Sequence, residues 1–199
     1  MKRVIRLLDG WVLNVIKMGI IKNFRQILLE ENGKMSYSGV EGYLTALRDI
    51  TSGAQKEYYE LLLDNLHKVN VGSYRDSRVL THHIDNLRRK MPKTDTFCQK
   101  KGCYDTAINV SVRIHDIDIN YVEGYVQSLI PIVHAWNYYE EENIYFDLIN
   151  DIAWEGSGHF QEYYEVLNLG RYELMGAMTH SGYAGGFLEN KDLVDYFLG

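Results

Sequence analysis

Cysteine is scarce in this chain, whose 199 residues include only Cys98 and Cys103. Two cysteines are too few for the disulfide framework that holds small secreted domains together. We therefore expect both thiols to be free, in a protein that works in a reducing, cytoplasmic environment.

The sequence also lacks a long uninterrupted apolar run. Residues 1–21 come nearest, but Arg6, Asp9 and Lys17 interrupt them and no small-residue cleavage site follows. A membrane-spanning helix needs about 20 mostly apolar residues, and a secretory signal needs such a cleavage site. The sequence thus predicts neither a membrane segment nor a targeting segment. Residues 3–30 instead carry apolar side chains at spacings of three and four, which favours an amphipathic helix packed on a core.

An excess of positive charge is absent as well. The chain has 21 lysines and arginines against 27 aspartates and glutamates, which gives a net charge of -6 at pH 7. Proteins that bind nucleic acid broadly carry a basic surface, so we expect no broad nucleic-acid binding. Only residues 88–101 are locally basic, which is typical of a solvated face, with an anion-binding rim as the alternative.

Helical patterns fill the first half of the chain, and no strand pattern is visible there. Capping residues and the stop at Pro92 predict three helices after the first, at about residues 38–50, 52–69 and 73–91. The second half mixes one helix with β-branched and aromatic runs and two short helices. The expected strands are residues 119–129, 132–138, 143–148 and 163–169, and the expected helices are 103–113, 171–179 and 191–198.

These patterns predict an α+β fold. Residues 1–92 form a helical region, which we interpret as a lid or a partner-binding element because it holds no cysteine and no plausible pair of base and acid. Residues 93–199 hold the strands and the candidate chemistry. The length of the chain also suits one continuous domain.

Cys103 is the candidate nucleophile. It opens the predicted helix 103–113, and Gly102 before it permits a tight turn into that helix. A thiolate at a helix N-terminus is stabilised by unpaired backbone N–H groups and by the helix macrodipole. The backbone N–H of Cys103, together with a side-chain amide such as that of Gln99, would form an oxyanion hole.

His134 and Asp147 are the candidate base and its orienting acid. They lie in the predicted strands 132–138 and 143–148, which are joined by the acidic loop 139–142. In an antiparallel hairpin with that loop the two residues stand directly opposite, with Cβ atoms about 5 Å apart. That separation lets the carboxylate hold one imidazole tautomer. Each of the three residues alone is typical of a core or turn position, and only their combination indicates a site.

Four short motifs give this combination a family resemblance. Their order and spacing resemble the transglutaminase-like branch of the papain-like cysteine fold, and more closely a group of short, mostly uncharacterised bacterial and phage proteins. The resemblance covers about residues 97–185. The pattern of that group has Asn where this chain has Thr106. The motifs are Cys103-Tyr104-Asp105-Thr106-Ala107, Tyr121-Val122-Glu123-Gly124-Tyr125, His134-Ala135-Trp136 and Asp147.

The resemblance implies a papain-like unit, a helix packed on an antiparallel sheet, within residues 93–199. It implies Cys103 as nucleophile, His134 as base and Asp147 as orienter. Glu123 and Trp136 are expected near the substrate, because a four-residue loop before residue 132 would pair Glu123 with Trp136 on the His134 side. A structural hydrogen bond for Glu123 and core packing for Trp136 are the alternatives.

The sequence therefore predicts cysteine-dependent acyl transfer or hydrolysis, as in an amidase, protease or transglutaminase-like enzyme. The substrate would be a protein or a small amide or acyl compound, and no cofactor is expected. No metal site is expected either, since the adjacent His82 and His83 point to different sides of a helix. The alternative is a non-enzymatic binding or host-interaction protein, of phage or bacterial origin, that keeps the fold. The oligomeric state stays open.

Overall fold

The computed structural model describes residues 39–91, 98, 102–127, 131–153 and 162–199. All of them belong to one compact unit, Ser38–Gly199. The predicted helix at residues 3–30 and the candidate Gln99 lie outside the described residues. Within the described ranges, no helix is long and apolar enough to cross a membrane.

Six strands of the described chain form one sheet in the order β1-β6-β3-β4-β5-β2. The central strand β3 is antiparallel to its two long neighbours, β4 and β6. The short outer strands extend the sheet on both sides: β1 and β5 pair antiparallel with β6 and β4, and β2 pairs parallel with β5. The strands are β1 (His67–Val69), β2 (Val71–Gly72), β3 (Ile119–Gln127), β4 (Ile132–Tyr139), β5 (Ile144–Phe146) and β6 (Glu162–Leu169).

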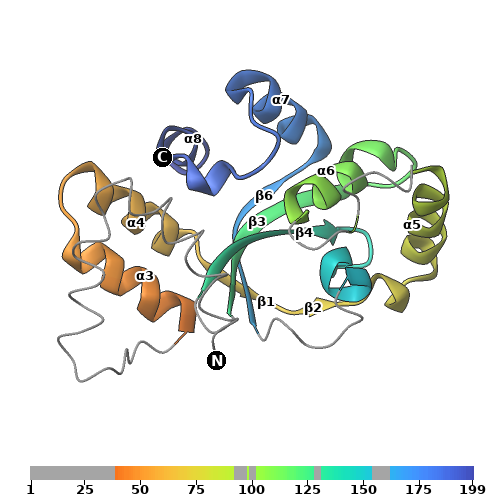
Figure 1. Ribbon diagram of the computed structural model, residues 1–199, viewed down its shortest axis with the longest axis horizontal. Coiled ribbons are helices and arrows are strands. Elements are labelled where there is room, and N and C mark those ends of the chain that lie inside the picture. The colour runs from red at the N-terminus through yellow and green to blue at the C-terminus, as the bar shows by residue number, and fades with distance from the viewer. Residues whose placement is uncertain (1–38, 92–97, 99–101, 128–130, 154–161) are drawn as a thin grey trace, which may run out of the picture. The chain divides into compact units, whose positions relative to one another are not determined.

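Helices flank this sheet, as Figure 1 shows. Helix α6 packs against β3 and β4, and α5 packs against α6, whereas α7 and α8 follow β6 and α8 contacts α4. The predicted α+β fold class is therefore confirmed. The helices are α3 (Gly39–Ile50), α4 (Ala54–Asp64), η1 (Tyr74–Asp76), α5 (Arg78–Lys90), α6 (Cys103–Arg113), η2 (Ile149–Ala153), α7 (Arg171–Ser181), η3 (Phe187–Glu189) and α8 (Lys191–Leu198).

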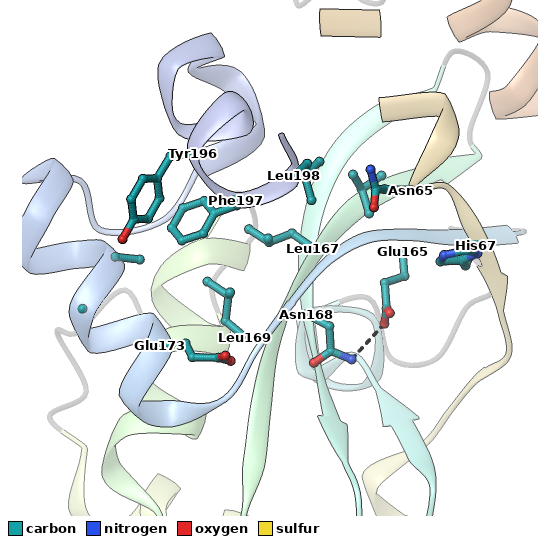
Figure 2. A pocket seen from close by; sticks show the side chains of 13 residues that line it. Asn65, His67, Glu165, Leu167, Asn168, Leu169, Glu173, Tyr196, Phe197 and Leu198 are labelled. Atoms are coloured by element: carbon teal, nitrogen blue, oxygen red, sulfur yellow. Dashed lines mark hydrogen bonds between the residues drawn. The ribbon is translucent and has the colours of Figure 1, made fainter. Parts of the chain in front are cut away.

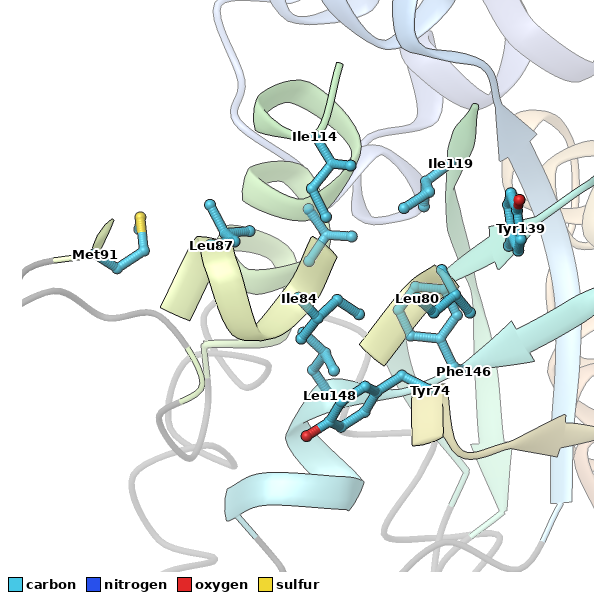
Figure 3. Close-up of a cluster of buried hydrophobic side chains, with 11 residues drawn as sticks. Tyr74, Leu80, Ile84, Leu87, Met91, Ile114, Ile119, Tyr139, Phe146 and Leu148 are labelled. Atoms are coloured by element: carbon cyan, nitrogen blue, oxygen red, sulfur yellow. The ribbon is translucent and has the colours of Figure 1, made fainter. Parts of the chain in front are cut away.

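A cluster of buried apolar side chains joins α5 and α6 to the sheet (Figure 3). The α5 residues Leu80, Ile84 and Leu87 recur at helical spacing and are at most 7% exposed. Ser77 caps this helix, since its Oγ accepts a hydrogen bond from Leu80 N at 3.1 Å. Burying each large apolar side chain contributes roughly 1.5–3 kcal/mol, so the cluster holds α6 against the strands. In this cluster the α5 residues are packed with Val110, Ile114, Ile119, Tyr139, Phe146 and Leu148.

The first half of the chain departs from the prediction in two respects. The helix predicted at about residues 73–91 is divided into the turn η1 and helix α5 by Ser77, whose backbone is extended. Helix α4 ends at Asp64, and the chain continues as β1 and β2 instead of as a helix to Val69. The carbonyl of Leu61 accepts both the backbone N–H and the side-chain amide of Asn65, which ends the helix there. The β-branched Val69 and Val71 that follow suit strands, and each of the two edges of the sheet takes up one short strand.

The strands predicted in the second half lie where they were expected, with ends that differ by at most two residues. The predicted boundary at residue 92 falls after β1 and β2, which belong to the same sheet as the later strands. Independent folding of residues 93–199 stays a prediction.

Candidate active site

Cys103 is the first residue of α6. Gly102 before it provides no capping side chain, and the first helical hydrogen bond runs from Thr106 N to Gly102 O at 2.9 Å. The N–H groups of the first turn precede that bond, so they point out of the helix end where the thiol lies. The Cys103 side chain is partly exposed and is therefore accessible to a reagent or substrate.

Asn137 on β4 fixes the position of α6. This residue is 1% exposed, and its Nδ2 lies 3.0 Å from the carbonyl of Ala107 and 3.0 Å from Ser111 Oγ. The same amide contacts the carbonyl of Asn120 on β3 at 3.1 Å. A buried amide bonded in this way ties the middle of α6 to the sheet, so the helix start is held against the strand that carries His134.

His134 and Asp147 form a buried pair. Nε2 of His134 lies 2.8 Å from Oδ2 of Asp147, and the side chains are 5% and 2% exposed. The prediction that these two residues lie within hydrogen-bonding reach is confirmed.

The strand register that brings them together differs from the predicted one. The loop has four residues as expected, but it spans residues 140–143, because Asn143 adopts a left-handed conformation (φ 55°) that closes the turn. Tyr139 therefore pairs with Ile144 and Asn137 with Phe146. The pairing is shifted by two residues, and a shift of two leaves every side chain on its predicted face. Asp147, just past β5, thus becomes a diagonal neighbour of His134 instead of its direct partner.

Asp147 is held by donors on both carboxylate oxygens. Besides the imidazole, the hydroxyl of Tyr163 donates to Oδ2 at 2.9 Å. Oδ1 accepts the backbone N–H groups of Ile149 at 2.9 Å and Asn150 at 3.2 Å, where the π-helical turn η2 begins. These bonds fix the orientation of the carboxylate and, through it, that of the imidazole ring.

Cys103 is the third member of this group. Burial lowers the pKa of His134, but the charge of Asp147 and the hydrogen bond between the two residues raise it, as do a side-chain hydrogen bond with Cys103 and the charge of Cys103. The net effect raises the pKa of His134 from 6.5 to about 10. The structure thus brings the three predicted catalytic residues together.

Cys98 lies near the same pair in a different environment. Burial raises the pKa of its thiol to about 12, the charge of Arg88 opposes the rise, and Asp147 adds to it. Its backbone N–H donates to Thr106 Oγ1 at 3.0 Å. Thr106 is buried and ties Cys98 to the first turn of α6. Both cysteines are free thiols.

The predicted position of Glu123 is wrong. Glu123 pairs with Ala135, and His134 pairs with Gly124, so the β3–β4 register differs by one residue from the expected one. A shift of one moves a side chain to the other face of the sheet. Glu123 is fully buried there and accepts a hydrogen bond from the Tyr121 hydroxyl. The backbone N–H groups of Phe187 and Leu188 also donate to its carboxylate, both at 3.0 Å. Burial raises the pKa of Glu123, although these donors lower it.

Trp136 lies beside the imidazole as expected. It is 1% exposed, and its ring lies nearly parallel to that of His134 at 6.2 Å between centroids. The ring of Tyr163 meets its edge at 5.3 Å. Its Nε1 has no hydrogen-bond partner in the part of the chain that the structure describes. The indole thus covers one side of the imidazole, while a contact with substrate stays a prediction.

Sequence reasoning missed two residues of this site, Asn137 and Tyr163. Tyr163 lies in a predicted strand, but nothing near it in the sequence indicates a bond to Asp147, 16 positions earlier. Asn137 carries a visible signal, a polar residue inside an apolar strand.

Among the described residues, no group of three or more His, Cys, Asp or Glu is placed to hold a metal ion. Comparisons with protein-family models, with curated proteins and with solved structures gave no match.

Proposed function

We propose that the protein is a cysteine-dependent hydrolase or acyltransferase with a papain-like, transglutaminase-like site. The observation that carries this proposal is the buried His134–Asp147 pair, joined by Cys103 at the start of a helix. Nucleophile, base and orienter within mutual reach are the arrangement that thiol acyl chemistry requires. Two free thiols suit the expected reducing, cytoplasmic setting.

The first half of the reaction forms a thioester. The Cys103 thiolate attacks the carbonyl carbon of an amide, ester or thioester, and the carbonyl electron pair moves to oxygen. The backbone N–H of Cys103 at the helix end would stabilise that oxyanion. When the intermediate collapses, the bond to the leaving group breaks, and the leaving amine takes a proton from the cationic His134.

The second half releases the acyl group. Water or an amine attacks the thioester carbon, the now neutral His134 takes its proton, and the thiolate leaves. Because Nε2 of His134 is bound to Asp147, the nitrogen that exchanges protons with the reactants is Nδ1. His134 and Asp147 are buried and only Cys103 is partly exposed, so a substrate reaches the sulfur first.

Thiol labelling tests the nucleophile directly. The protein is treated with iodoacetamide at pH 7, and the modified cysteine is located by peptide mass spectrometry. We expect wild type and Cys98→Ser to react at the same rate, Cys103→Ser to resist, and His134→Gln to slow labelling at least tenfold. Cys98 is the matched control because burial holds its pKa at about 12. A Cys103 that reacts no faster than Cys98 would contradict the proposal.

Acyl transfer is tested with p-nitrophenyl acetate. We expect a burst of p-nitrophenol, one acetyl group on Cys103 in the intact mass, and slow turnover that disappears in Cys103→Ser. One observation favours the alternative, a binding protein that keeps the fold: Thr106 bonds Cys98 and stands where the family pattern has Asn. A reactive Cys103 that is never acylated by this ester or by a panel of thioesters would favour that alternative.

A further inference from the structure

Asp151 lies one turn after Asp147, in the π-helical turn η2. Its backbone N–H donates to the carbonyl of Asp147 at 2.9 Å. The same turn supplies the backbone N–H groups of Ile149 and Asn150, which bind Oδ1 of Asp147. Turns of this kind are rare and are found frequently at functional sites. The conformation of η2 therefore decides where these two donors stand beside the Asp147 carboxylate.

The side chain of Asp151 ties η2 to the first half of the chain. Its Oδ2 accepts the hydroxyl of Ser73 at 2.9 Å and the backbone N–H of Tyr74 at 3.2 Å. These two donors stand at the start of η1, directly after β2, and β2 pairs with the strand β5 that leads to Asp147. Tyr74 and Leu148 also pack in the same apolar cluster (Figure 3). The segment at Ser73 and Tyr74 thus supports the chain on both sides of Asp147.

The charges near Asp151 show why these donors matter. Burial raises the pKa of Asp151, and the hydrogen bonds from Ser73 and Tyr74 oppose the rise. The charge of Asp147 adds to the rise, and the charge of Arg75 opposes it. Without its donors, this half-buried carboxylate would be left near a like charge, which favours a different conformation of η2.

We propose that Ser73 and Asp151 are positioning residues, which act through η2 to orient Asp147 and thereby the imidazole of His134 beside Cys103. This role rests on the proposed function. It gives the segment that begins at Ser73 a part in the proposed active site, although it lies in the region that the sequence interpretation assigned to a lid or a partner-binding element.

The cavity beside β6 provides no comparable link. It has a volume of about 630 Å³, and its walls come from the end of α4 and from β1, β6, α7 and α8 (Figure 2). Neither Ser73 nor Asp151 lines it, and none of the three proposed catalytic residues does. Within the described residues, the first half of the chain therefore reaches Asp147 at the β2 edge of the sheet and not at the β1 edge.

Ser73→Ala tests the link without changing a charge, because it removes one donor to Asp151. A less firmly oriented Asp147 stabilises the imidazolium less, so we expect the pKa of His134 to fall from about 10 by about half a pH unit or more. An NMR titration of the full chain measures this pKa, and the resonance is assigned by its absence in His134→Gln. The iodoacetamide rate at Cys103 at pH 7 should fall about threefold, since the thiolate loses part of its support from the imidazolium.

Two further variants separate this role from a purely structural one. Ser77→Ala removes the neighbouring cap, the bond from Leu80 N, and so destabilises the same part of the chain. It should leave the pKa of His134 and the labelling rate unchanged. Ser73→Thr keeps a hydroxyl at the link and should match wild type in both measurements.

An unchanged pKa of His134 in Ser73→Ala would refute the positioning role, and so would an equal shift in Ser77→Ala. The proposed function fails by a different result, a wild-type Cys103 that labels no faster than Cys98. That result would stand even if the pKa of His134 shows that Ser73 orients the buried pair.

Discussion

Asp147 and Glu123 are both buried carboxylates beside the same sheet, but they differ in the charge of their partners. Both accept a tyrosine hydroxyl and two backbone N–H groups. Asp147 also has the imidazole of His134 at 2.8 Å, whereas the Glu123 hydrogen bonds come from neutral groups. The hydrogen-bond donors are thus similar, and the cation is the difference.

That difference separates the proposed catalytic site from a structural clamp. The charge of Asp147 keeps the proton on His134 and thereby links the carboxylate to the protonation state beside Cys103. Glu123 has no such counter-charge, and its bonds to Phe187 and Leu188 hold the chain around η3 on β3. A buried carboxylate alone is therefore poor evidence for a catalytic role, and the partner decides.

The largest effect is expected for Asp147→Ala. This change leaves the buried His134, the Tyr163 hydroxyl and two backbone N–H groups without their acceptor. Breaking a buried ion pair typically costs about 3–5 kcal/mol, so we expect a loss of that size in the free energy of unfolding, measured by urea denaturation. The iodoacetamide rate at Cys103 should also fall at least tenfold. A loss below about 1 kcal/mol, with labelling unchanged, would show that the pair is not coupled to the thiol.

The pH dependence of stability is the second test of the comparison. The folded-state pKa of His134 is raised from 6.5 to about 10, so its contribution to stability is complete below pH 6.5 and is lost as pH rises towards 10. The slope for one proton approaches about 1.4 kcal/mol per pH unit inside that window. Urea unfolding at several pH values should show this slope in wild type and not in His134→Gln. The variant keeps the tyrosines and Cys98, so equal slopes in both proteins would contradict the assignment.

A smaller effect is expected for Glu123→Gln. The amide keeps one acceptor but turns an NH2 group towards the backbone N–H of Phe187 or Leu188, so one bond is lost and two donors face each other. A buried donor left unsatisfied costs about 1–3 kcal/mol in unfolding free energy. The labelling rate of Cys103 should stay within about twofold of wild type, because no cation is lost. A tenfold slower rate would place Glu123 in the proposed active site after all.

Strand register explains how far the sequence predicted this site. Both hairpins were placed from the sequence, and both registers were wrong. The predicted register of β4 with β5 was wrong by two residues. A shift of two leaves each side chain on its predicted face, so His134 and Asp147 meet as expected. The error between β3 and β4 was one residue, which moved Glu123 to the opposite face. Periodicity predicts that two strands pair, but the turn conformation decides the register.

The sequence could not predict contacts that depend on distant elements. The two-residue β2 and the end of α4 depend on the sheet edges that accept β1 and β2, and local propensity does not contain that information. The bond from Tyr163 to Asp147 likewise depends on the order of strands in the sheet. Cys103 was predictable because a helix start, with its preceding glycine, is a local feature of the chain.

The smallest effect tests how tightly the Glu123 clamp packs against the start of α6. Gly185 has φ 89°, and a Cβ there would lie 2.7 Å from Tyr104 Cβ and 2.9 Å from the Tyr121 hydroxyl oxygen. Gly53 is the matched control, since it has φ 59° and no heavy atom within 4 Å of the added Cβ. Alanine at either position pays for a left-handed backbone, at about 1–2 kcal/mol. Only at Gly185 does the methyl group also collide with a neighbour.

We therefore expect Gly185→Ala to lower the free energy of unfolding by about 1 kcal/mol more than Gly53→Ala, the usual lower range for overpacking. Because Tyr104 directly follows Cys103, the same methyl group should shift the first turn of α6 and change the iodoacetamide rate at Cys103, whereas Gly53→Ala should leave that rate unchanged. Urea denaturation and labelling of the two variants, side by side, give both readouts. Equal losses of stability with equal labelling rates would mean that the chain around Gly185 moves to make room for the added methyl group. The packing of that chain against Tyr104 would then not hold the first turn of α6 in place.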